Sequence, residues 1–385
     1  MAAKKVLILG GGAGGVVAAR RLREVLKPEE VEITVIDKSE FHEFRPSYLW
    51  VMTGIREPDD VRRPLKALEK YGIRYVQDNV VEIDPANRAV KGEKGSYDYD
   101  YLVVALGAAL KEDIEAPGVC APWSMEGALR CRSILSEVRS PSAKIVIGPA
   151  SWPYRCPPAP FEVAFLLKYL MEQRGVKADI KVFHVWGRPM EPFGPLMSSM
   201  FSQMLNQYGI EFVGGAQFQE VDGASRRVRL STGDLEYDVA VVIPPHAPPA
   251  PVAKSELADP QTGWMKVEIP HMRNPKYKEV FGVGDVVAPT IGLGMAGVFA
   301  HFQAEHVASQ IADEVKGVYM GEHYNMSGVC VMDLGYMGAA VYCDFSKKLV
   351  EGAPYPDCRM LGVSRAFRII KAAFERMWFS SLFGY

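Results

Sequence analysis

The sequence lacks several features that would assign it to common protein classes. Its 44 lysines and arginines nearly balance 46 aspartates and glutamates, and the net charge of −2 gives no electrostatic reason to expect a nucleic-acid partner. The six cysteines contain no CxxC pair, which argues against structural zinc, and we expect no metal site. No apolar run approaches eighteen residues, so we expect no bilayer-spanning segment.

The chain is nevertheless long enough to form more than one hydrophobic core. Its 385 residues, 48% of them apolar, predict two or three domains. The apolar N-terminal segment is interrupted by six consecutive small residues, of which five are glycine. We therefore identify no signal peptide and expect the protein to remain on the cytoplasmic side.

A dinucleotide-binding motif explains these glycines. An apolar strand over residues 5–9 leads into residues 10–15 (GGGAGG), and a helical pattern and a second strand over residues 31–36 follow. Gly10 permits a tight turn, Gly12 lets the backbone approach a pyrophosphate, and Gly15 lets the helix pack closely. Asp37 is placed to accept the ribose hydroxyls. A glycine-rich loop that binds nothing is the weaker interpretation.

A second strand unit lacks what a nicotinamide dinucleotide needs. The strand over residues 144–147 is followed by GPASWP, which has one glycine where three are needed and places two prolines and Trp152 in the turn. The next strand, over residues 180–185, ends in Trp186, Gly187 and Arg188 instead of an acid. The reductant is therefore expected to be something other than NAD(P)H.

Four segments together resemble the sulfide:quinone oxidoreductases, whose close relative is the flavin subunit of flavocytochrome c sulfide dehydrogenase. They are the glycine motif and residues 154–162 (YRCPPAPFE), 241–248 (VVIPPHAP) and 329–335 (VCVMDLG). The resemblance covers nearly the whole chain. It implies an α/β fold with two Rossmann-like dinucleotide-binding domains and a C-terminal region that covers the flavin and anchors the protein to a membrane. We place the FAD domain at residues 1–115 and 262–325, the second domain at 116–261 and the C-terminal region at 326–385.

The resemblance implies FAD as the cofactor. The strand end Ala105-Leu106-Gly107 and the later pair Gly284-Asp285 look like two further FAD-contacting signals of such flavoproteins. The helix that follows would point its positive N-terminal end at the flavin. The FAD is expected to be non-covalent, because Trp123 stands where many relatives carry a linking cysteine and Cys120 is out of register. The expected cofactor contacts are Gly10, Gly12, Ala13, Gly14, Gly15, Asp37, Lys38, Pro46, Val80, Ala105, Gly107, Gly284, Asp285 and Gly297.

The resemblance also implies a redox pair of Cys156 and Cys330 above the flavin, which would oxidise sulfide to polysulfide and pass the electrons to a membrane quinone. Cys330 would face the flavin, and Cys156 would take or hold sulfane sulfur. Arg155 beside that sulfur is expected to lower its pKa. Glu162 is either a proton-transfer group or a first-turn acid favoured by the helix dipole, and we weigh these equally.

The other cysteines are given lesser roles. Cys343 is the alternative to Cys330 as the flavin partner. Cys131, on a helical stretch, and Cys358, in a loop, are read as small buried apolar residues. His246 is the histidine that we expect nearest the site, and an ordinary loop residue without a role at the site is an equal alternative.

The C-terminal segment predicts an interfacial helix. At helical spacing Phe367, Ile370, Phe374 and Met377 share one face, and an aromatic end begins at Trp378. The alternative is a helix docked on the protein's own core or on another subunit, and a homo-oligomer is left open. We place Arg365 and Phe367 on the quinone side and expect a peripheral, monotopic protein on the cytoplasmic membrane.

Three other functions remain open. A type II NADH:quinone dehydrogenase would need a second glycine motif, which this chain lacks. A cytochrome-coupled sulfide dehydrogenase flavin subunit should carry an export signal and a flavin-linking cysteine. A non-catalytic flavin redox sensor is disfavoured by the cysteine pair.

Overall fold

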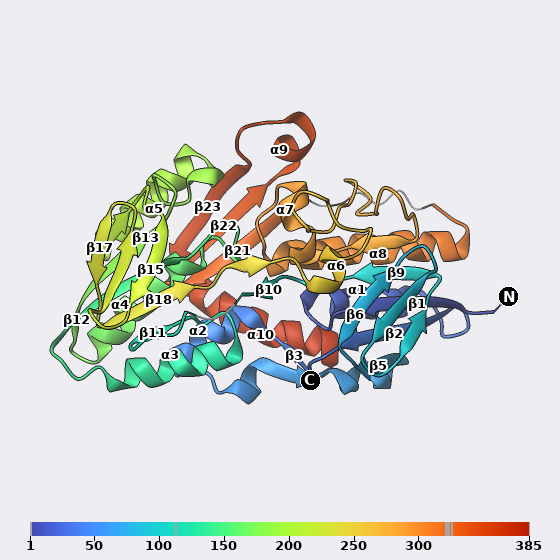
Figure 1. The fold of residues 1–385 in the computed structure, drawn as a ribbon, viewed down its shortest axis with the longest axis horizontal. Coiled ribbons are helices and arrows are strands. Elements are labelled where there is room, and N and C mark those ends of the chain that lie inside the picture. Colours follow the sequence, from blue (N-terminus) through green and yellow to red (C-terminus); the bar gives the residue numbers. More distant parts are fainter. Residues whose placement is uncertain (1, 112–113, 320–323, 325, 385) are drawn as a thin grey trace.

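The chain forms two lobes, each built on a five-stranded parallel sheet (Figure 1). The computed structural model describes residues 2–111, 114–319, 324 and 326–384. The strands of both sheets are runs of valine, isoleucine and leucine, because a parallel sheet is covered on both faces. The first sheet has the order β20-β9-β1-β2-β5, with β1 (Lys4–Leu9), β2 (Val31–Asp37), β5 (Ile73–Gln77), β9 (Tyr101–Val104) and β20 (Val280–Gly282).

Two helices pack together on the first sheet. The glycine-rich start of α1 (Ala13–Val25) allows it to lie closely against α8 (Gly297–Lys316). The lobe also contains β3 (Phe41–Glu43), β4 (Arg62–Pro64), β6 (Val80–Asp84), β7 (Ala89–Gly92), β8 (Ser96–Asp98), α2 (Tyr48–Met52), α6 (Ala250–Ala253), α7 (Ala288–Ile291), and the 3-10 helices η1 (Arg45–Ser47), η2 (Pro58–Val61), η3 (Leu65–Tyr71) and η5 (Gly284–Val286).

The second sheet has the order β11-β18-β12-β13-β14. A three-stranded antiparallel sheet extends this lobe, and β10 (Ala109–Leu110) pairs with β19 (His246–Ala247). The elements of this lobe are β11 (Val119–Cys120), β12 (Ser142–Pro149), β13 (Lys177–Phe183), β14 (Ile210–Val213), β15 (Phe218–Asp222), β16 (Arg227–Leu230), β17 (Gly233–Glu236), β18 (Val239–Ile243), α3 (Met125–Glu137), α4 (Ala159–Gln173), α5 (Pro195–Gln207) and η4 (Glu191–Phe193).

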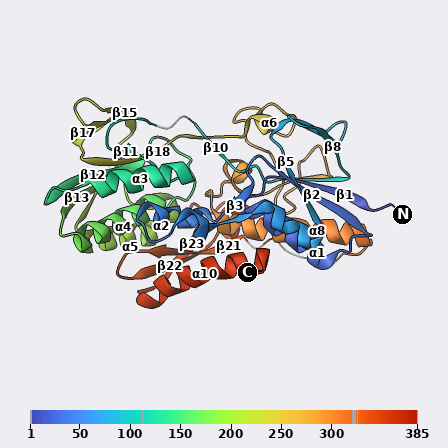
Figure 2. The same cartoon turned by 90° about the horizontal axis from the view of Figure 1, so that it is seen from below.

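The C-terminal region is an antiparallel sheet covered by a helix. Strands β21 (Ser327–Asp333), β22 (Gly338–Asp344) and β23 (Asp357–Ser364) pair in order, with α9 (Ser346–Glu351) between the last two. Helix α10 (Arg365–Phe383) packs on this sheet, along one edge of the molecule (Figure 2). The α/β fold with two Rossmann-like sheets and a C-terminal helical region is confirmed.

One cysteine position differs from its expected local structure. Cys358 lies in strand β23 and not in a loop. Among the described residues, no helix is both long enough and apolar enough to cross a membrane.

Candidate active site

The glycine loop after β1 makes an open cradle of backbone. Gly10 has φ +105°, and a Cβ there would lie 2.4 Å from the carbonyl oxygen of Ala105. A Cβ at Gly12 would meet nothing within 4 Å, so this stretch of backbone is open to a bound group. Gly12 caps α1 without a side-chain hydrogen bond, and the first turn holds no acidic residue. The N–H groups and the positive end of the helix are therefore available to an anion such as a pyrophosphate.

Asp37 holds this loop in place. Its carboxylate accepts hydrogen bonds from the backbone N–H groups of Gly11, at 2.6 Å, and of Ser39, at 2.7 Å. A carboxylate has about four lone-pair positions, so it retains capacity for ribose hydroxyls. Asp37 thus has a structural role that sequence reasoning missed, while its contact with the ribose stays a prediction.

Some of the other expected cofactor positions lie near this loop, and their contacts with FAD stay a prediction. A Cβ at Gly14 would touch Val283 and lie near Ala300, which places α1 beside the segment after β20 and the start of α8. Val80 follows Asp78, whose N–H donates to the carbonyl of Asp37 at 3.0 Å. The expected positions are distributed over several elements. Ala13, Gly14 and Gly15 begin α1, Lys38 follows β2, Pro46 is exposed in η1, and Val80 begins β6. Ala105 and Gly107 follow β9, Gly284 and Asp285 begin η5, and Gly297 begins α8.

Two polar features near Arg155 would suit a bound cofactor. His246 Nδ1 contacts the carbonyl of Pro244 at 3.0 Å, whereas its buried Nε2 has no hydrogen-bond partner among the described residues. Burial and the nearby Arg155 cation lower the pKa of His246 to about 4, so the ring is neutral. Asp285 pairs with Arg155, whose Nε lies 3.0 Å from the carboxylate. An orphaned buried nitrogen beside a charged pair is suited to a polar ligand.

Arg155 does not act on the Cys156 sulfur as expected. Its guanidinium contacts Asp285 and the carbonyl oxygens of Ala108 and Trp123. Burial raises the pKa of the Cys156 thiol well above its usual range, and the expectation of a lowered pKa is wrong. Burial is the largest cause of the raised pKa, and the Arg155 guanidinium, which is committed to other partners, does not offset it.

The structure brings Cys156 and Cys330 into electrostatic range of each other. Both are unpaired cysteines, and the charge of Cys330 contributes to the raised pKa of Cys156. Cys156 N–H donates to the carbonyl of Met295 at 2.7 Å, which fixes the turn before α4. Cys330 lies on β21. Burial raises the pKa of Cys330 to about 11, so each thiol is protonated at neutral pH unless something removes its proton.

A buried ion pair lies beside the two thiols. Glu162, in the first turn of α4, pairs with Lys371 of α10 and also accepts the N–H of Asp333 at 2.8 Å. Burial raises the pKa of Glu162, and Lys371 opposes that rise. The charges of Glu162 and Lys371 act on both thiols in opposite directions. Glu162 is thus more than a dipole-favoured helix acid.

Lys371 is a site residue that sequence reasoning missed. The expected cation, Arg365, is exposed at the start of α10, and Phe367 beside it is half-buried, whereas Lys371 is buried. A signal was present in the sequence, because Lys371, Glu375, Trp378 and Leu382 form one helical stripe, and this stripe faces inward.

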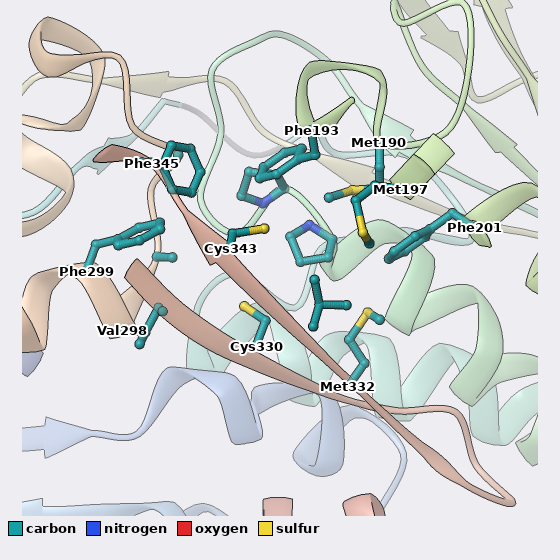
Figure 3. Close-up of a pocket in the computed structure, with 16 residues that line it drawn as sticks. Met190, Phe193, Met197, Phe201, Val298, Phe299, Cys330, Met332, Cys343 and Phe345 are labelled. Carbon is teal, nitrogen blue, oxygen red and sulfur yellow. The ribbon is translucent and has the colours of Figure 1, made fainter. Parts of the chain in front are cut away.

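An apolar cavity of about 50 Å³ lies between the C-terminal sheet, which carries Cys330, and the second lobe (Figure 3). Pro157 and Pro158, directly after Cys156, line it on one side, and Cys330 and Cys343 line it from the C-terminal sheet. The rest of the wall is almost wholly apolar and rich in methionine and phenylalanine: Met190, Phe193, Met197, Phe201, Val298, Phe299, Met332, Val341 and Phe345. Such a wall suits an apolar, polarisable guest better than an ion.

The four other cysteines form two disulfides. Cys120 pairs with Cys131, and Cys343 pairs with Cys358. Cys131 and Cys358 are buried, as expected, but as disulfide partners and not as isolated thiols. Cys343 is not a free thiol that could replace Cys330. Pairing could not be deduced from the sequence, since it depends on which strands and helices become neighbours.

The C-terminal helix has both an exposed apolar face, as an interfacial helix would, and a face docked on the protein's own core. Ile370, Phe374 and Met377 are exposed, by 48%, 50% and 65%, and Ile369 joins them at 68%. The aromatic end was expected on the surface, but Trp378, Phe379, Leu382 and Phe383 are buried against the first lobe. That part of the expectation is wrong because His42 and Phe44 provide a matching aromatic surface; Tyr385 lies outside the described residues.

Aromatic side chains stand at the carboxyl ends of β12 and β13, where a second dinucleotide would need open backbone. The ring centroid of Trp186 lies 5.1 Å from that of Trp152 and 3.7 Å from that of His184. Tyr154 donates to the carbonyl of Pro157 at 3.0 Å and contacts His184. The turn is therefore filled by its own side chains.

Comparisons with known proteins agree with this geometry. A family model described as pyridine nucleotide-disulphide oxidoreductase matches residues 4–149, and one for the central part of the sulfide dehydrogenase (flavocytochrome c) flavoprotein chain matches residues 131–244. The mitochondrial sulfide:quinone oxidoreductase of Dictyostelium discoideum is 27% identical over 365 residues, which cover 91% of this chain and 78% of that protein.

A solved structure supports the fold. The sulfide:quinone oxidoreductase from Aquifex aeolicus matches 99% of this chain and 92% of its own, with a TM-score of 0.87 and 24% identity. A type II NADH:quinone oxidoreductase of Staphylococcus aureus is 39% identical, but over only 106 residues, or 27% of this chain and 26% of that protein. These findings confirm the resemblance inferred from the sequence.

Proposed function

We propose that this protein is a sulfide:quinone oxidoreductase, which oxidises sulfide to polysulfide at Cys156 and Cys330 and reduces a membrane quinone through bound FAD. One observation carries the proposal: Cys330 lines an apolar cavity, Cys156 directly precedes the cavity-lining Pro157, and the charges of the buried Glu162–Lys371 pair act on both unpaired thiols. The extensive similarity to sulfide:quinone oxidoreductases supports the same reaction.

The residues present fit FAD. The loop over residues 10–15 and the start of α1 would hold the pyrophosphate, Asp37 the ribose, and Gly284, Asp285 and the start of α8 the flavin side. Bound there, FAD would supply a two-electron acceptor between the thiols and the quinone. We propose non-covalent FAD, because four cysteines are paired in disulfides and we assign the other two, Cys156 and Cys330, to the sulfur chemistry.

The two thiols carry the sulfur chemistry. In the oxidised enzyme, Cys156 and Cys330, which are unpaired in this structure, would form a disulfide. Hydrosulfide would attack it, leave a persulfide on one sulfur and release the other as a thiolate. Burial disfavours that thiolate, so the ammonium of Lys371 is needed to stabilise it. The apolar cavity next to the sulfurs can accept a growing, weakly solvated sulfur chain.

Glu162 and Lys371 serve the quinone side. They join α4 to α10, and their buried position allows a proton to move between the thiols and the outer helix without passing through bulk water. We propose them, with Arg365 and Phe367 near the start of α10, as the residues that border the quinone.

The exposed face of α10 is proposed to lie in a membrane interface. Ile369, Ile370, Phe374 and Met377 are together on the surface, with Arg365 and Arg376 exposed on the same helix. The protein would then be peripheral and monotopic, and its placement on the cytoplasmic side remains a prediction from the sequence. A homo-oligomer also remains a prediction.

The donor is tested by anaerobic mixing of the oxidised, FAD-loaded protein with sulfide. We expect rapid loss of the visible flavin absorbance with sulfide and none with NADH, because Trp152 and Trp186 fill the second turn. Cys156→Ser and Cys330→Ser should each slow the loss by about 10³-fold, as expected for removal of a reacting group.

The matched control is the double variant Cys120→Ser/Cys131→Ser, which removes a disulfide that does not line the cavity. Sulfide should bleach the flavin of this variant at the wild-type rate. If NADH bleached the flavin at least as fast as sulfide does, the result would instead favour a type II NADH:quinone oxidoreductase. Unchanged sulfide bleaching in both single variants would refute the cysteine mechanism.

A further inference from the structure

The Cys343–Cys358 disulfide shares a cavity wall with Cys330. In the register of β21 and β22, Cys330 is opposite Val341 and Gly328 is opposite Cys343. Residues two apart on a strand point to the same face, so Cys330 and Cys343 are diagonal neighbours on one side of the sheet. Cys330, Cys343 and Gly328 all line the cavity (Figure 3).

Gly328 keeps the space beside Cys343 open. A Cβ at this position would lie 3.0 Å from a methyl group of Val298, which is itself part of the cavity wall. A side chain opposite Cys343 would therefore narrow the cavity next to the disulfide. With glycine there, a guest that reaches Cys330 can also reach Cys343.

The spacing of the two cysteines selects the kind of guest. Diagonal neighbours in an antiparallel pair have Cβ atoms about 6–7 Å apart. A direct disulfide requires about 4 Å between Cβ atoms, and each inserted sulfur adds roughly 2 Å. Cys330 and Cys343 are thus too far apart for a direct bond but within the span of a bridge that contains one or two sulfane sulfurs.

We propose that the Cys343–Cys358 disulfide accepts sulfane sulfur from Cys330 by exchange; this inference rests on the sulfide-oxidising function proposed above. The terminal sulfur of a persulfide on Cys330 attacks Sγ of Cys343, and a new S–S bond forms. The bond between Cys343 and Cys358 breaks, and its electron pair leaves on Sγ of Cys358, which takes a proton. One S–S bond is made and one is broken, so no further oxidant or reductant is needed.

The result is a polysulfide bridge from Cys330 to Cys343 and a thiol on Cys358. The bridge holds the sulfur chain inside the apolar cavity, and attack by Cys358 on Cys343 reverses it. Cys358 lies directly opposite Cys343 on β23, so the leaving thiol stays in position for this return. The pair acts as a reversible store of sulfane sulfur next to the reacting cysteines.

The second disulfide of the chain provides a matched control. Cys120 and Cys131 join β11 to α3, and neither lines the cavity. Cys131 is fully buried and Cys120 is 4% exposed. Sulfane sulfur on Cys330 therefore has no route to this disulfide in the folded protein.

The experiment treats the FAD-loaded protein anaerobically with inorganic polysulfide, quenches it in acid, alkylates free thiols and maps the peptides without reduction. We expect alkylated Cys358 to rise about tenfold above alkylated Cys120, together with a peptide that links Cys330 to Cys343 through one or two extra sulfurs. Protein in which Cys330 is a bare thiol, prepared with a mild thiol reductant, should keep Cys343–Cys358 intact, because the direct bond cannot form.

Cys330→Ser tests the route. In this variant Cys358 should stay unalkylated; equal alkylation with and without Cys330 would mean that dissolved polysulfide attacks directly, and the proposal would be wrong. It would also be wrong if Cys330 carried a persulfide while Cys343–Cys358 stayed as oxidised as Cys120–Cys131. The exchange needs only added polysulfide, so it succeeds or fails independently of flavin bleaching by sulfide, which tests the proposed function.

Discussion

Two charged residues that act on the reacting thiols come from helices that are far apart in the chain. Glu162 lies in the first turn of α4 and Lys371 in α10, yet their side chains form one buried pair, in which Glu162 also accepts the Asp333 N–H. A buried pair is strongly destabilising when one partner is removed, because the remaining charge loses its compensation. The pair therefore links stability, proton transfer and the attachment of α10.

Lys371→Met should destabilise the protein and move its pH dependence. We expect a loss of about 3 kcal/mol in the free energy of unfolding, because Glu162 is left buried without its cation. Lys371 lowers the pKa of Glu162, so the variant has a higher Glu162 pKa, and its carboxylate becomes available only at higher pH. The acidic limb of the rate of quinone reduction should shift upward. Urea unfolding and a pH profile of the rate measure the two effects.

The control is the double variant Glu162→Gln/Lys371→Met. It removes both charges, so it should be less destabilised than Lys371→Met alone. Equal loss in the two variants would show that the charges do not interact.

The thiol of Cys330 should be slow to react with an alkylating agent. Its pKa is raised to about 11 by burial, so in the reduced protein its alkylation rate should rise about tenfold per pH unit from neutral pH to about pH 10. Lys371 lowers this pKa, so Lys371→Met should slow alkylation further at every pH below 10. Mass spectrometry of the Cys330 peptide measures the rate, and a plateau near pH 8 would contradict it.

Helix α10 shows what a single element can and cannot reveal through its sequence. Its amphipathic character was predictable, and Ile370, Phe374 and Met377 are exposed as the helical spacing suggested. The inward stripe that begins at Lys371 was not predicted, because its burial depends on partners in α4 and in the first lobe. The same limit applies to the disulfides, where the strand pairing of β22 with β23 brings Cys343 to Cys358.

The exposed face of α10 should bind membranes. Phe374→Glu/Met377→Glu should weaken cosedimentation with anionic phospholipid vesicles by about tenfold or more, since roughly 2 kcal/mol of apolar burial is lost. Flavin bleaching by sulfide should stay unchanged because neither residue approaches the thiols. Leu196→Glu on α5, at a similarly exposed leucine, is the matched control and should leave vesicle binding intact.

His42 joins the glycine loop to the same helix. Its Nδ1 lies 2.8 Å from the Gly11 carbonyl, and its Nε2 accepts the indole N–H of Trp378 at 2.9 Å, so Nδ1 carries the proton. His42→Phe leaves two buried polar groups unpaired, at about 1–3 kcal/mol each. We expect a lower melting temperature and about tenfold weaker FAD binding, measured by cofactor titration. His271→Phe, at an exposed histidine, should change neither.

At the scale of the whole molecule, the fold was the most predictable feature. The ordered motif of strand, glycine turn, helix, strand and acid is local, and local patterns can be read directly. The direction of the Arg155 side chain was not predictable, because its guanidinium turns toward Asp285, which is distant in the sequence. The cavity likewise draws its wall from η4, α5, α8, β21 and β22, and no sequence window contains them all.

Buried histidines should make the whole molecule sensitive to acid. Burial lowers the pKa values of His42, His184 and His246 from 6.5 to about 4, 3 and 4. The unfolded chain takes up these protons as the pH falls below about 6.5, whereas the folded chain does not, so stability is lost from there down to about pH 4. Three such groups predict a loss of about 4 kcal/mol per pH unit near pH 5.

Urea unfolding at a series of pH values measures this slope. His184→Gln should reduce it by about a third, because one of the three buried rings is removed. A flat profile between pH 6 and pH 4 would contradict the prediction.

The edge strand β20 has a consequence for how the protein is made. The glycine loop lies within the first tens of residues to leave the ribosome. Strand β20, which completes its sheet, and helix α8, which packs against α1, emerge only after residue 279. The second lobe lies between these segments in the sequence, so it can fold before the first lobe has its last strand. We therefore expect the nascent chain to acquire its cofactor only late in synthesis, when that strand has left the exit tunnel.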